Sequence, residues 1–307
     1  MTYRILVPLD GSALAEGAIP MAIDLARRSK GSLRFVRVHT PVMPIATVGD
    51  LAVPFYDPAW DDQLRKIAHD YLQATAAKAE RELGHPVTTK VRDGSHIPDE
   101  IEREAGEFSA NLILMTTHGH GGSALAWLGS IADGVVRSTH RLVLVVPERA
   151  TAQPFTMRSL LIALDGTESS ASVVAPAADL ARLFGATIKL VRVVEPPIVG
   201  DVLTAVTSET LDRFGIDRVA DAAKADIDAV AAPLRQQGLQ VDTTVIVHPN
   251  PARALIEHVS QAGADLVAMG THGRGVSRLF VGSVADKVLR GSGRPSLIRH
   301  PVAANER

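Results

Sequence analysis

Short apolar runs rich in β-branched residues alternate with longer segments of helical periodicity along the first half of the chain. The runs predict parallel strands, because strands buried on both faces read as nearly continuous hydrophobic segments. They lie at residues 4–9, 33–39, 87–92, 111–115 and 142–146. Helices are expected at residues 13–28, 60–83 and 98–108 and from residue 130 onward, and a proline-bearing loop at 40–58. Strands that alternate with helices predict an α/β fold whose parallel sheet is covered on both faces.

The same pattern restarts at Ser159. Residues 4–39 align with residues 159–194 without a gap, and 12 of these 36 positions are identical. A repeat of this length predicts two domains that arose by duplication. The polar, proline-bearing sequence between the copies is typical of a linker. We expect domain 1 at residues 1–148, the linker at 149–157 and domain 2 at 158–303.

Composition narrows the class of protein. The 307 residues are 46% hydrophobic and 21% charged, with a formal net charge of −2. This balance, without a long basic block, gives no reason to expect nucleic-acid binding. The absence of cysteine excludes disulfides, thiol nucleophiles and cysteine-bound metals. The first residues already form an expected strand rather than a signal peptide. No apolar run approaches the ~20 residues needed to cross a bilayer, so no membrane association is expected. We therefore expect a soluble, cytoplasmic protein.

A glycine-rich segment occurs twice, at residues 111–138 and 265–291, with Met, Thr-His-Gly, Gly-Ser and Ala-Asp in the same order. Each copy predicts a strand, a glycine-rich loop and the start of a helix. Such a loop suits an anionic ligand, because glycines allow close approach of the backbone and the first helical turn carries partial positive charge. Ser283 stands where its side chain can cap the helix or meet a phosphate. A glycine loop alone is equally compatible with a sharp turn, and the repetition favours the binding site.

These segments, together with VPLDGS at 7–12 and ALDGT at 163–167, resemble the universal stress protein family in its tandem form. The resemblance covers nearly the whole chain and implies two Rossmann-like domains, each with a five-stranded parallel sheet of order 3-2-1-4-5. It also implies an adenine nucleotide, ATP with or without Mg²⁺, between strands 1 and 4, where open α/β sheets generally bind ligands. In ATP-binding members the loop reads Gly, two residues, Gly, nine residues, then Gly-Ser or Gly-Thr.

The first copy departs from this loop pattern at its opening position, where Thr116 replaces glycine. Gly119, a spacing of nine residues and Gly129-Ser130 then follow the pattern. The threonine adds a β-branched side chain where close approach to the ribose is expected.

The second copy keeps Gly270 and Gly273, but only eight residues separate Gly273 from Gly282. One missing residue can move backbone donors by ~3.5 Å, more than a hydrogen bond tolerates. Arg274 and Arg278 can donate charge-assisted hydrogen bonds to phosphate, unless they lie on a solvated loop face. We therefore expect the two halves to bind unequally, the C-terminal half more tightly.

The resemblance also assigns roles to individual residues. Asp10 and Asp165 contact the adenine, and Val38 and Val193 offer backbone groups to the edge of the ring. The alternative for the aspartates is an Asx-turn or a helix cap. Phosphates are expected at Gly119, Gly129, Ser130, Gly273, Gly282 and Ser283, where the alternative is turn geometry alone. The other residues expected at the nucleotide are Pro8, Met115, Thr116, Met269, Gly270 and Arg274.

Three histidines of the glycine loops, His118, His120 and His272, raise the question of a metal. Two histidines two residues apart, without a nearby carboxylate, make a poor site for zinc or iron. Packing or hydrogen bonding within the loop is favoured, and no metal site is expected.

The leading functional hypothesis is an ATP-binding stress-response protein whose ligand regulates its shape or its partners. The loop lacks the Lys-Ser/Thr ending of a P-loop, so no kinase or ATPase is expected and any ATP hydrolysis should be slow. One alternative is a scaffold of the same fold that binds no nucleotide. The other is an enzyme that adenylylates its substrate, for which no signature is found.

Two expectations concern the arrangement of the chain. The halves should pack as a pseudo-twofold pair through the fifth strands, 142–146 and 296–299, because pairing would cover unpaired hydrophobic edges. The sequence leaves further homodimerisation open. The segments 40–58 and 195–208 should lie over or beside the nucleotide crevice, because both leave from the ligand end of the sheet.

Overall fold

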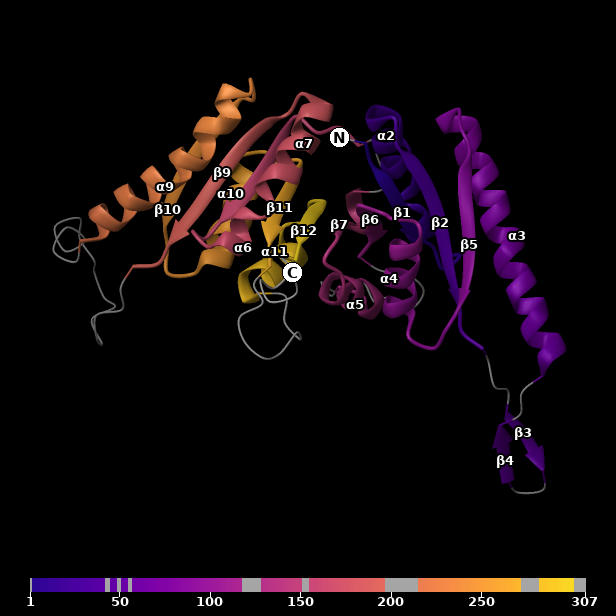
Figure 1. Ribbon diagram of the computed structural model, residues 1–307. Helices are drawn as coiled ribbons and strands as arrows, with labels where there is room; N and C mark the ends of the chain where they lie inside the picture. Colours follow the sequence, from indigo (N-terminus) through magenta and orange to yellow (C-terminus); the bar gives the residue numbers. More distant parts are fainter. Residues whose placement is uncertain are drawn as a thin grey trace. The chain divides into compact units, whose positions relative to one another are not determined.

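A computed structural model describes residues 2–41, 45–48, 51–54, 57–117, 128–150, 155–196, 215–271 and 282–300. The chain divides into two compact units, Met1–Phe155 and Thr156–Arg307, called here the first half and the second half (Figure 1). Among the described residues, no helix has both the length and the apolar character needed to cross a membrane.

Each half contains a five-stranded parallel sheet. In the first half the strands are β1 (Arg4–Pro8), β2 (Ser32–His39), β5 (Val87–Asp93), β6 (Leu112–Thr116) and β7 (Leu142–Val146). In the second half they are β8 (Ser159–Leu164), β9 (Thr187–Val194), β10 (Val241–Val247), β11 (Leu266–Gly270) and β12 (Ser296–Arg299). The orders within the halves are β5-β2-β1-β6-β7 and β10-β9-β8-β11-β12. Both are the expected order 3-2-1-4-5, so this prediction is confirmed.

Helices connect consecutive strands in both halves. The first half has α1 (Ala13–Glu16), α2 (Ile19–Ser29), α3 (Pro58–Leu83), α4 (Ile97–Glu107), α5 (Ser130–Ser138) and the 3-10 helix η1 (Glu148–Ala150). The second half has α6 (Glu168–Ala171), α7 (Val174–Phe184), α9 (Ile216–Gln236), α10 (Pro251–Gln261) and α11 (Ser283–Gly291).

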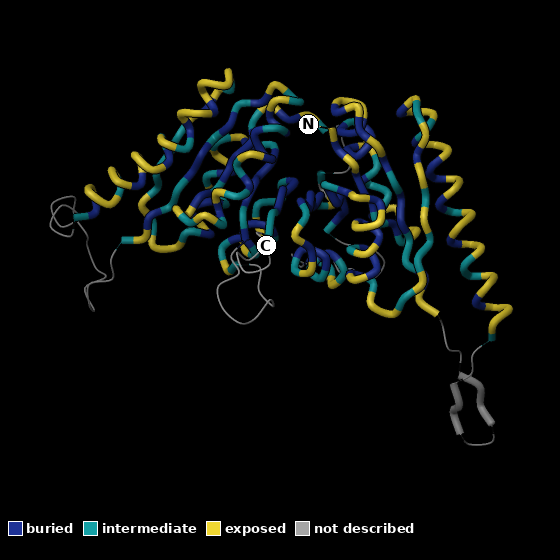
Figure 2. Tube along the Cα trace, in the orientation of Figure 1, coloured by how far each residue is buried: buried dark blue, intermediate teal, exposed yellow. Residues whose placement is uncertain are grey.

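The helices lie on both faces of the sheet. On β5, Thr89 accepts a hydrogen bond from Gln73 of α3, whereas Arg92 contacts Glu100 of α4. Residues 89 and 92 point to opposite faces because side chains alternate along a strand. All five residues of β6 and of β7 are buried, which explains why both strands read as continuous apolar runs. The central strands are buried in each half, whereas α3 and α9 are largely exposed (Figure 2).

The helix expected at 13–28 is in fact two helices, and the prediction of one continuous helix was wrong. α1 ends at the C-cap Gly17, and α2 begins at Ile19. Pro20 occupies one of the first two positions of α2. Proline has no N–H and its ring clashes with the carbonyl four residues earlier, so it cannot continue a helix that began at Ala13.

The loop expected at 40–58 contains a hairpin, which corrects the second local prediction. β3 (Ile45–Val48) pairs in antiparallel fashion with β4 (Leu51–Pro54). Two residues, Gly49-Asp50, separate these runs in the sequence. Two strand-like runs separated by two turn-forming residues are a hairpin signal, and the prolines of the segment obscured it.

Candidate functional site

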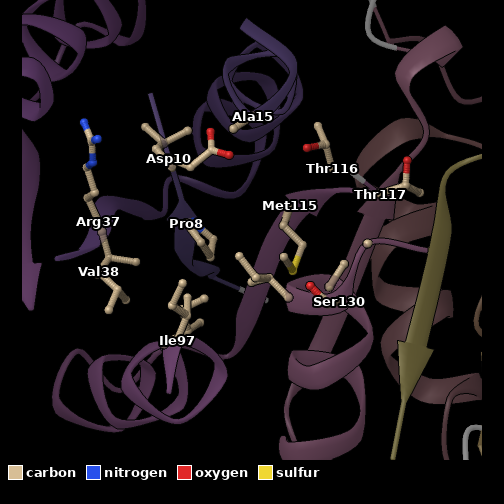
Figure 3. Close-up of a pocket in the computed structure, with 16 residues that line it drawn as sticks. Pro8, Asp10, Ala15, Arg37, Val38, Ile97, Met115, Thr116, Thr117 and Ser130 are labelled. Carbon is tan, nitrogen blue, oxygen red and sulfur yellow. The ribbon is translucent and has the colours of Figure 1, made fainter. Parts of the chain in front are cut away.

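A cavity of about 290 Å³ opens at the carboxyl ends of the strands in the first half (Figure 3). It lies where β1 has β2 on one side and β6 on the other, which is the point where the strand order reverses. The lining includes Pro8, Asp10, Val38, Met115, Thr116, Gly129 and Ser130. Seven of the eight residues expected at the first nucleotide are therefore brought together. The eighth, Gly119, lies outside the described residues.

Asp10 forms a tight turn between β1 and α1. Its Oδ1 accepts the backbone N–H of Ser12 at 2.9 Å and the Ser12 hydroxyl at 2.6 Å. The Ser12 Oγ in turn accepts the N–H of Ala15 at 3.1 Å and caps α1. The Asx-turn alternative is therefore present. Asp10 also lines the cavity, so the turn is compatible with the expected ligand contact, which stays a prediction.

The N-terminus of α5 faces the same cavity and has no side-chain cap. Its N-cap is Gly129, and within the described part of the chain no side chain makes a capping hydrogen bond there. The first three helical residues, Ser130, Ile131 and Ala132, all line the cavity. N–H groups at these positions have no acceptor within the helix, and they carry its partial positive charge. The arrangement can bind an anion through backbone donors.

Val38 presents backbone groups to the opposite side of the cavity. The N–H of Leu9 donates to Val36 O, and the N–H of Gly94 donates to His39 O, so even-numbered residues of this part of β2 face β1. β1 ends at Pro8, opposite Val36. The N–H and C=O of Val38 therefore point to where β1 no longer offers a ladder partner. They can bond the edge of a planar ring. In Figure 3, Val38 and Ser130 lie on opposite sides of Met115.

A second cavity of about 500 Å³ occupies the same place in the second half. The expected residues that line it are Asp165, Val193, Met269, Gly270, Gly282 and Ser283. Asp165 repeats the Asx-turn, with its Oδ1 2.9 Å from the Thr167 N and 2.6 Å from the Thr167 Oγ1. α11 repeats the uncapped start, with Gly282 as N-cap and the first three helical residues lining the cavity. Ser283 is thus the first helical residue, and the alternative that it caps the helix is wrong.

Two positions that line the cavities carry smaller side chains in the second half. Pro8 is replaced by Ala163, and Thr116 is replaced by Gly270. A Cβ placed on Gly270 would lie 2.2 Å from the carbonyl oxygen of Ser169 in α6. Glycine is therefore required there by the close approach of α6 to β11, whatever it contributes to ligand binding. Thr116 is buried at the corresponding position of the first half, which shows that α1 leaves room for its side chain.

Several lining residues could not be assigned from the sequence. Arg37 lines the first cavity, and its guanidinium lies 5.3 Å from the centre of the Tyr71 ring. Burial and the hydrogen bond to Glu16 raise the pKa of this tyrosine. Glu195 lines the second cavity. The helix after the third strand contributes Ile97 and Ile101 to the first cavity and Pro251 and Leu255 to the second. The available signal was the apolar first turn of that helix in both repeats.

Some expected features lie outside the described residues. These are Gly119, Gly273, Arg274, Arg278 and the loop histidines His118, His120 and His272. Within the described ranges, no group of three or more His, Asp or Glu side chains could hold a metal ion. Of the segment 195–208, only residues 195 and 196 are described, so its position over the crevice stays a prediction.

The chain is similar to proteins of one family. The model of the Universal stress protein family matches residues 1–147 and 156–299. A universal stress protein of Mycobacterium tuberculosis (strain H37Rv) is 25% identical over 305 residues, covering 96% of each chain. A second one from that strain is 26% identical over 310 residues, covering 96% of this chain and 98% of its own. The crystal structure of a universal stress protein from Archaeoglobus fulgidus covers 97% of this chain and 96% of its own, with 17% identity and a TM-score of 0.68.

Proposed function

This chain belongs to the universal stress protein family, and from that premise we propose that each half binds an adenine nucleotide, ATP foremost, in a regulatory rather than a catalytic role. The proposal places one nucleotide in each of the two cavities at the carboxyl ends of the strands. Nucleotide binding would then change the conformation at the carboxyl ends of the strands, and this change would alter the binding of partner proteins.

The uncapped helix start in each cavity carries the proposal. α1 and α6 are capped by the hydroxyls of Ser12 and Thr167, whereas α5 and α11 have no side-chain cap. Uncapped N–H groups that line a cavity need an acceptor, and a phosphate supplies several oxygens along the helix axis. The same device occurs in both halves, which is why we assign a ligand to both.

The other end of each cavity fits a purine base. The first cavity has apolar walls from Met115, Ile97 and Ile101, and polar groups from Asp10 and the backbone of Val38. Mostly apolar walls with a few oriented polar groups are typical of small-molecule sites. An adenine can stack between the walls, donate its amino group to the carboxylate and bond the strand edge.

A metal would arrive with the phosphates. The described part of the chain offers no cluster of three metal-ligating side chains. Asp10 and Asp165 each use one carboxylate oxygen in their turn. A Mg²⁺ ion that accompanies ATP would therefore rely on phosphate oxygens and water, the coordination that Mg²⁺ commonly keeps.

The first experiment asks what the freshly purified protein carries. Denatured protein is analysed by mass spectrometry, with adenine nucleotide as the expected result. Titration calorimetry with ATP and with adenosine then measures binding to the emptied protein. Failure of both ligands to bind would contradict the proposal and favour the non-binding scaffold.

The second experiment removes one backbone donor at a time. Ser130→Pro and Ser283→Pro delete the N–H of the first helical residue, a position that proline fits. The preceding glycines already have extended ψ angles of 150° and 142°, which proline requires of its neighbour. Ser130→Ala and Ser283→Ala are the controls, since they remove the hydroxyl and keep the N–H. We expect the proline variants to weaken ATP about tenfold, the loss of one charge-assisted hydrogen bond, and to leave adenosine unchanged. Equal losses for ATP and adenosine would contradict phosphate binding at the helix.

A further inference from the structure

β10 is the end strand of the sheet in the second half (Figure 1). The N–H of Ile188 donates to Gln240 O, and the N–H of His248 donates to Val194 O. Even-numbered residues of β10 therefore face β9, and the backbone groups of Thr243, Val245 and Val247 point away from the sheet. Within the described ranges, β10 pairs only with β9. Its outer edge presents a row of donors and acceptors to an incoming strand.

The side chains of β10 favour such pairing. Six of its seven residues are Val, Ile or Thr, and it contains neither proline nor glycine. Thr243, Thr244, Val245 and Ile246 are half-buried, and Val247 is 41% exposed. A strand of this composition at an open edge is a typical site of intermolecular strand pairing.

The corresponding edge of the first half is protected by charge. β5 carries Lys90, Arg92 and Asp93 where β10 has Thr244, Ile246 and Val247. Arg92 pairs with Glu100, Glu104 and Glu107, and Asp93 pairs with Arg65. Charged residues on an edge strand are a common means of preventing pairing. The two edges have the same topology, so the difference lies in the sequence of β10.

β10 is complementary to a second copy of itself. An antiparallel pair centred on Val245 places Thr243 opposite Val247 and Thr244 opposite Ile246. The next pair outward is Asp242 with His248. The side chain of Asp242 is exposed, and its carboxylate takes part in no hydrogen bond or ion pair within the described residues. The Nδ1 atom of His248 lies 2.9 Å from both the backbone N and the backbone O of Asn250, which leaves the Nε2 atom to meet the carboxylate.

We propose that β10 is a self-association surface, on which a second copy of this chain adds its own β10 in antiparallel orientation about Val245. The two-fold axis makes the contact isologous, so it closes after two copies. Each dimer contains two Asp242–His248 pairs. These pairs fix the register of the two strands, because the uniformly β-branched centre of β10 would pair equally well in other registers. No residue of β10 lines the second cavity, and the proposal does not depend on the proposed function.

The expected dimer is concentration-dependent. A pairing of two seven-residue strands buries less than the ~1,600 Å² of a standard stable interface. We therefore expect association in the micromolar range, measured by sedimentation equilibrium of the full chain over about 1–500 μM. A chain that stays monomeric over this range overturns the proposal.

Val245→Pro tests the edge itself. Proline removes the outward N–H at the centre of the pair and is tolerated on an edge strand. Val91→Pro is the matched control, because Val91 occupies the same position on β5 and its backbone also points outward. We expect Val245→Pro to raise the dimer dissociation constant at least tenfold and Val91→Pro to leave it unchanged. Equal effects of the two variants, with both folded by circular dichroism, overturn the proposal.

A charge exchange tests the register without disturbing the strand. Asp242→His places two histidines opposite each other, and His248→Asp places two carboxylates opposite each other. Each single variant should weaken the dimer by about threefold or more. The double variant D242H/H248D restores the pair with its members exchanged, and dimerisation should recover. A double variant weaker than either single variant overturns the proposed register.

Discussion

The two halves are nearly the same at the carboxyl ends of their strands, where the cavities lie. They differ where α4 and α10 pack against the sheet. Asp10 and Asp165 make the same two hydrogen bonds with the same lengths, 2.9 Å and 2.6 Å. α5 and α11 each have a glycine as N-cap, lack a side-chain cap and contain nine residues. Further down, Glu104 of α4 is fully buried between Arg34 and Arg92. The corresponding residue of α10 is His258, beside Lys189.

This difference indicates which parts of the fold the proposed nucleotide site would constrain. The turn, the strand ends and the uncapped helix set the positions of donors and acceptors, so one departure there would change binding. The charged layer only has to satisfy the groups that it buries. A buried ion network and a layer with fewer buried charges are both stable solutions when every buried polar group has a partner. The two halves use one solution each.

The largest effect is expected from a substitution in the charged layer of the first half, which consists of Glu104 and its partners Arg34 and Arg92. Glu104→Ala leaves Arg34 and Arg92 partly unpaired in a buried site, and removal of one partner from a buried ion pair costs about 3–5 kcal/mol. Both arginines keep other hydrogen bonds, to Thr88 and Glu100, so we expect about 3 kcal/mol. Urea unfolding of the full chain, read by hydrogen exchange in each half, measures the loss.

The matched control is His258→Ala in the second half. We expect about 1 kcal/mol or less, because no buried charge loses its only partner. The comparison fails if the two variants destabilise their halves equally. That result would mean that the charged layer of the first half contributes no more than ordinary packing.

The next effect concerns the opening position of the glycine loop. Gly270→Thr, which copies Thr116 into the second half, forces a Cβ to within 2.2 Å of the Ser169 carbonyl. Overpacking against backbone is expected to cost about 3 kcal/mol and to displace α6. The reverse change, Thr116→Gly, should cost about 1 kcal/mol, the usual penalty of glycine in a strand. Thermal unfolding of both variants measures the difference, and a tolerated Gly270→Thr would show that α6 moves freely.

The sequence predicted the sheets well because the buried strands are continuous apolar runs. The run expected at 142–146 coincides with β7, and the helix expected at 60–83 ends at the same residue as α3. The break between α1 and α2 was missed, because the apolar periodicity continues across it while Pro20 interrupts the hydrogen bonds. Local patterns therefore predicted the strands of the parallel sheet, but not the β3–β4 hairpin or every place where a helix ends.

The site was predicted less completely, for a physical reason. Asp10 follows β1 closely, and Gly129 and Ser130 stand at the start of the helix that comes after β6 in the sequence. The motif and the strand order therefore place them at one edge of the sheet. Ile97 and Ile101 reach the same cavity only because α4 packs with its first turn against the strand ends. Periodicity shows that this helix has an apolar face, and tertiary packing decides what that face covers.

The third prediction sharpens the comparison of the two cavities. Asp165→Ala should lower the affinity for ATP about tenfold, or about 1.4 kcal/mol, and Asp10→Ala should have a smaller effect. The reason is the sequence of the second glycine loop, which keeps Gly270 and Gly273 and supplies Arg274, a residue that can donate charge-assisted hydrogen bonds to phosphate. Calorimetry with both variants measures the affinities and the stoichiometry.

Asp165→Asn separates the ligand role of this aspartate from its role in the turn. The amide oxygen still accepts the N–H of Thr167, while the carboxylate charge is lost. We expect the asparagine variant to bind as weakly as the alanine variant. Binding at the wild-type level would assign Asp165 to the turn alone. Loss of binding in the Asp10 variant only would reverse the order of the two halves.

The smallest expected effect is a pH dependence of the local stability of α10 in the second half. Burial lowers the pKa of His258, and the positive charge of Lys189 adds to this. The unfolded chain therefore binds a proton on this histidine more readily than the folded chain does. The resulting stability is fully present above the unfolded pKa of about 6.5 and is lost as the pH falls towards the folded pKa. Protection factors of α10 amides, corrected for intrinsic exchange, should fall between pH 7.5 and 5.5, and His258→Gln should reduce that fall. A fall of the same size in the variant would assign the pH dependence to other groups, and the two halves would then not differ at this position.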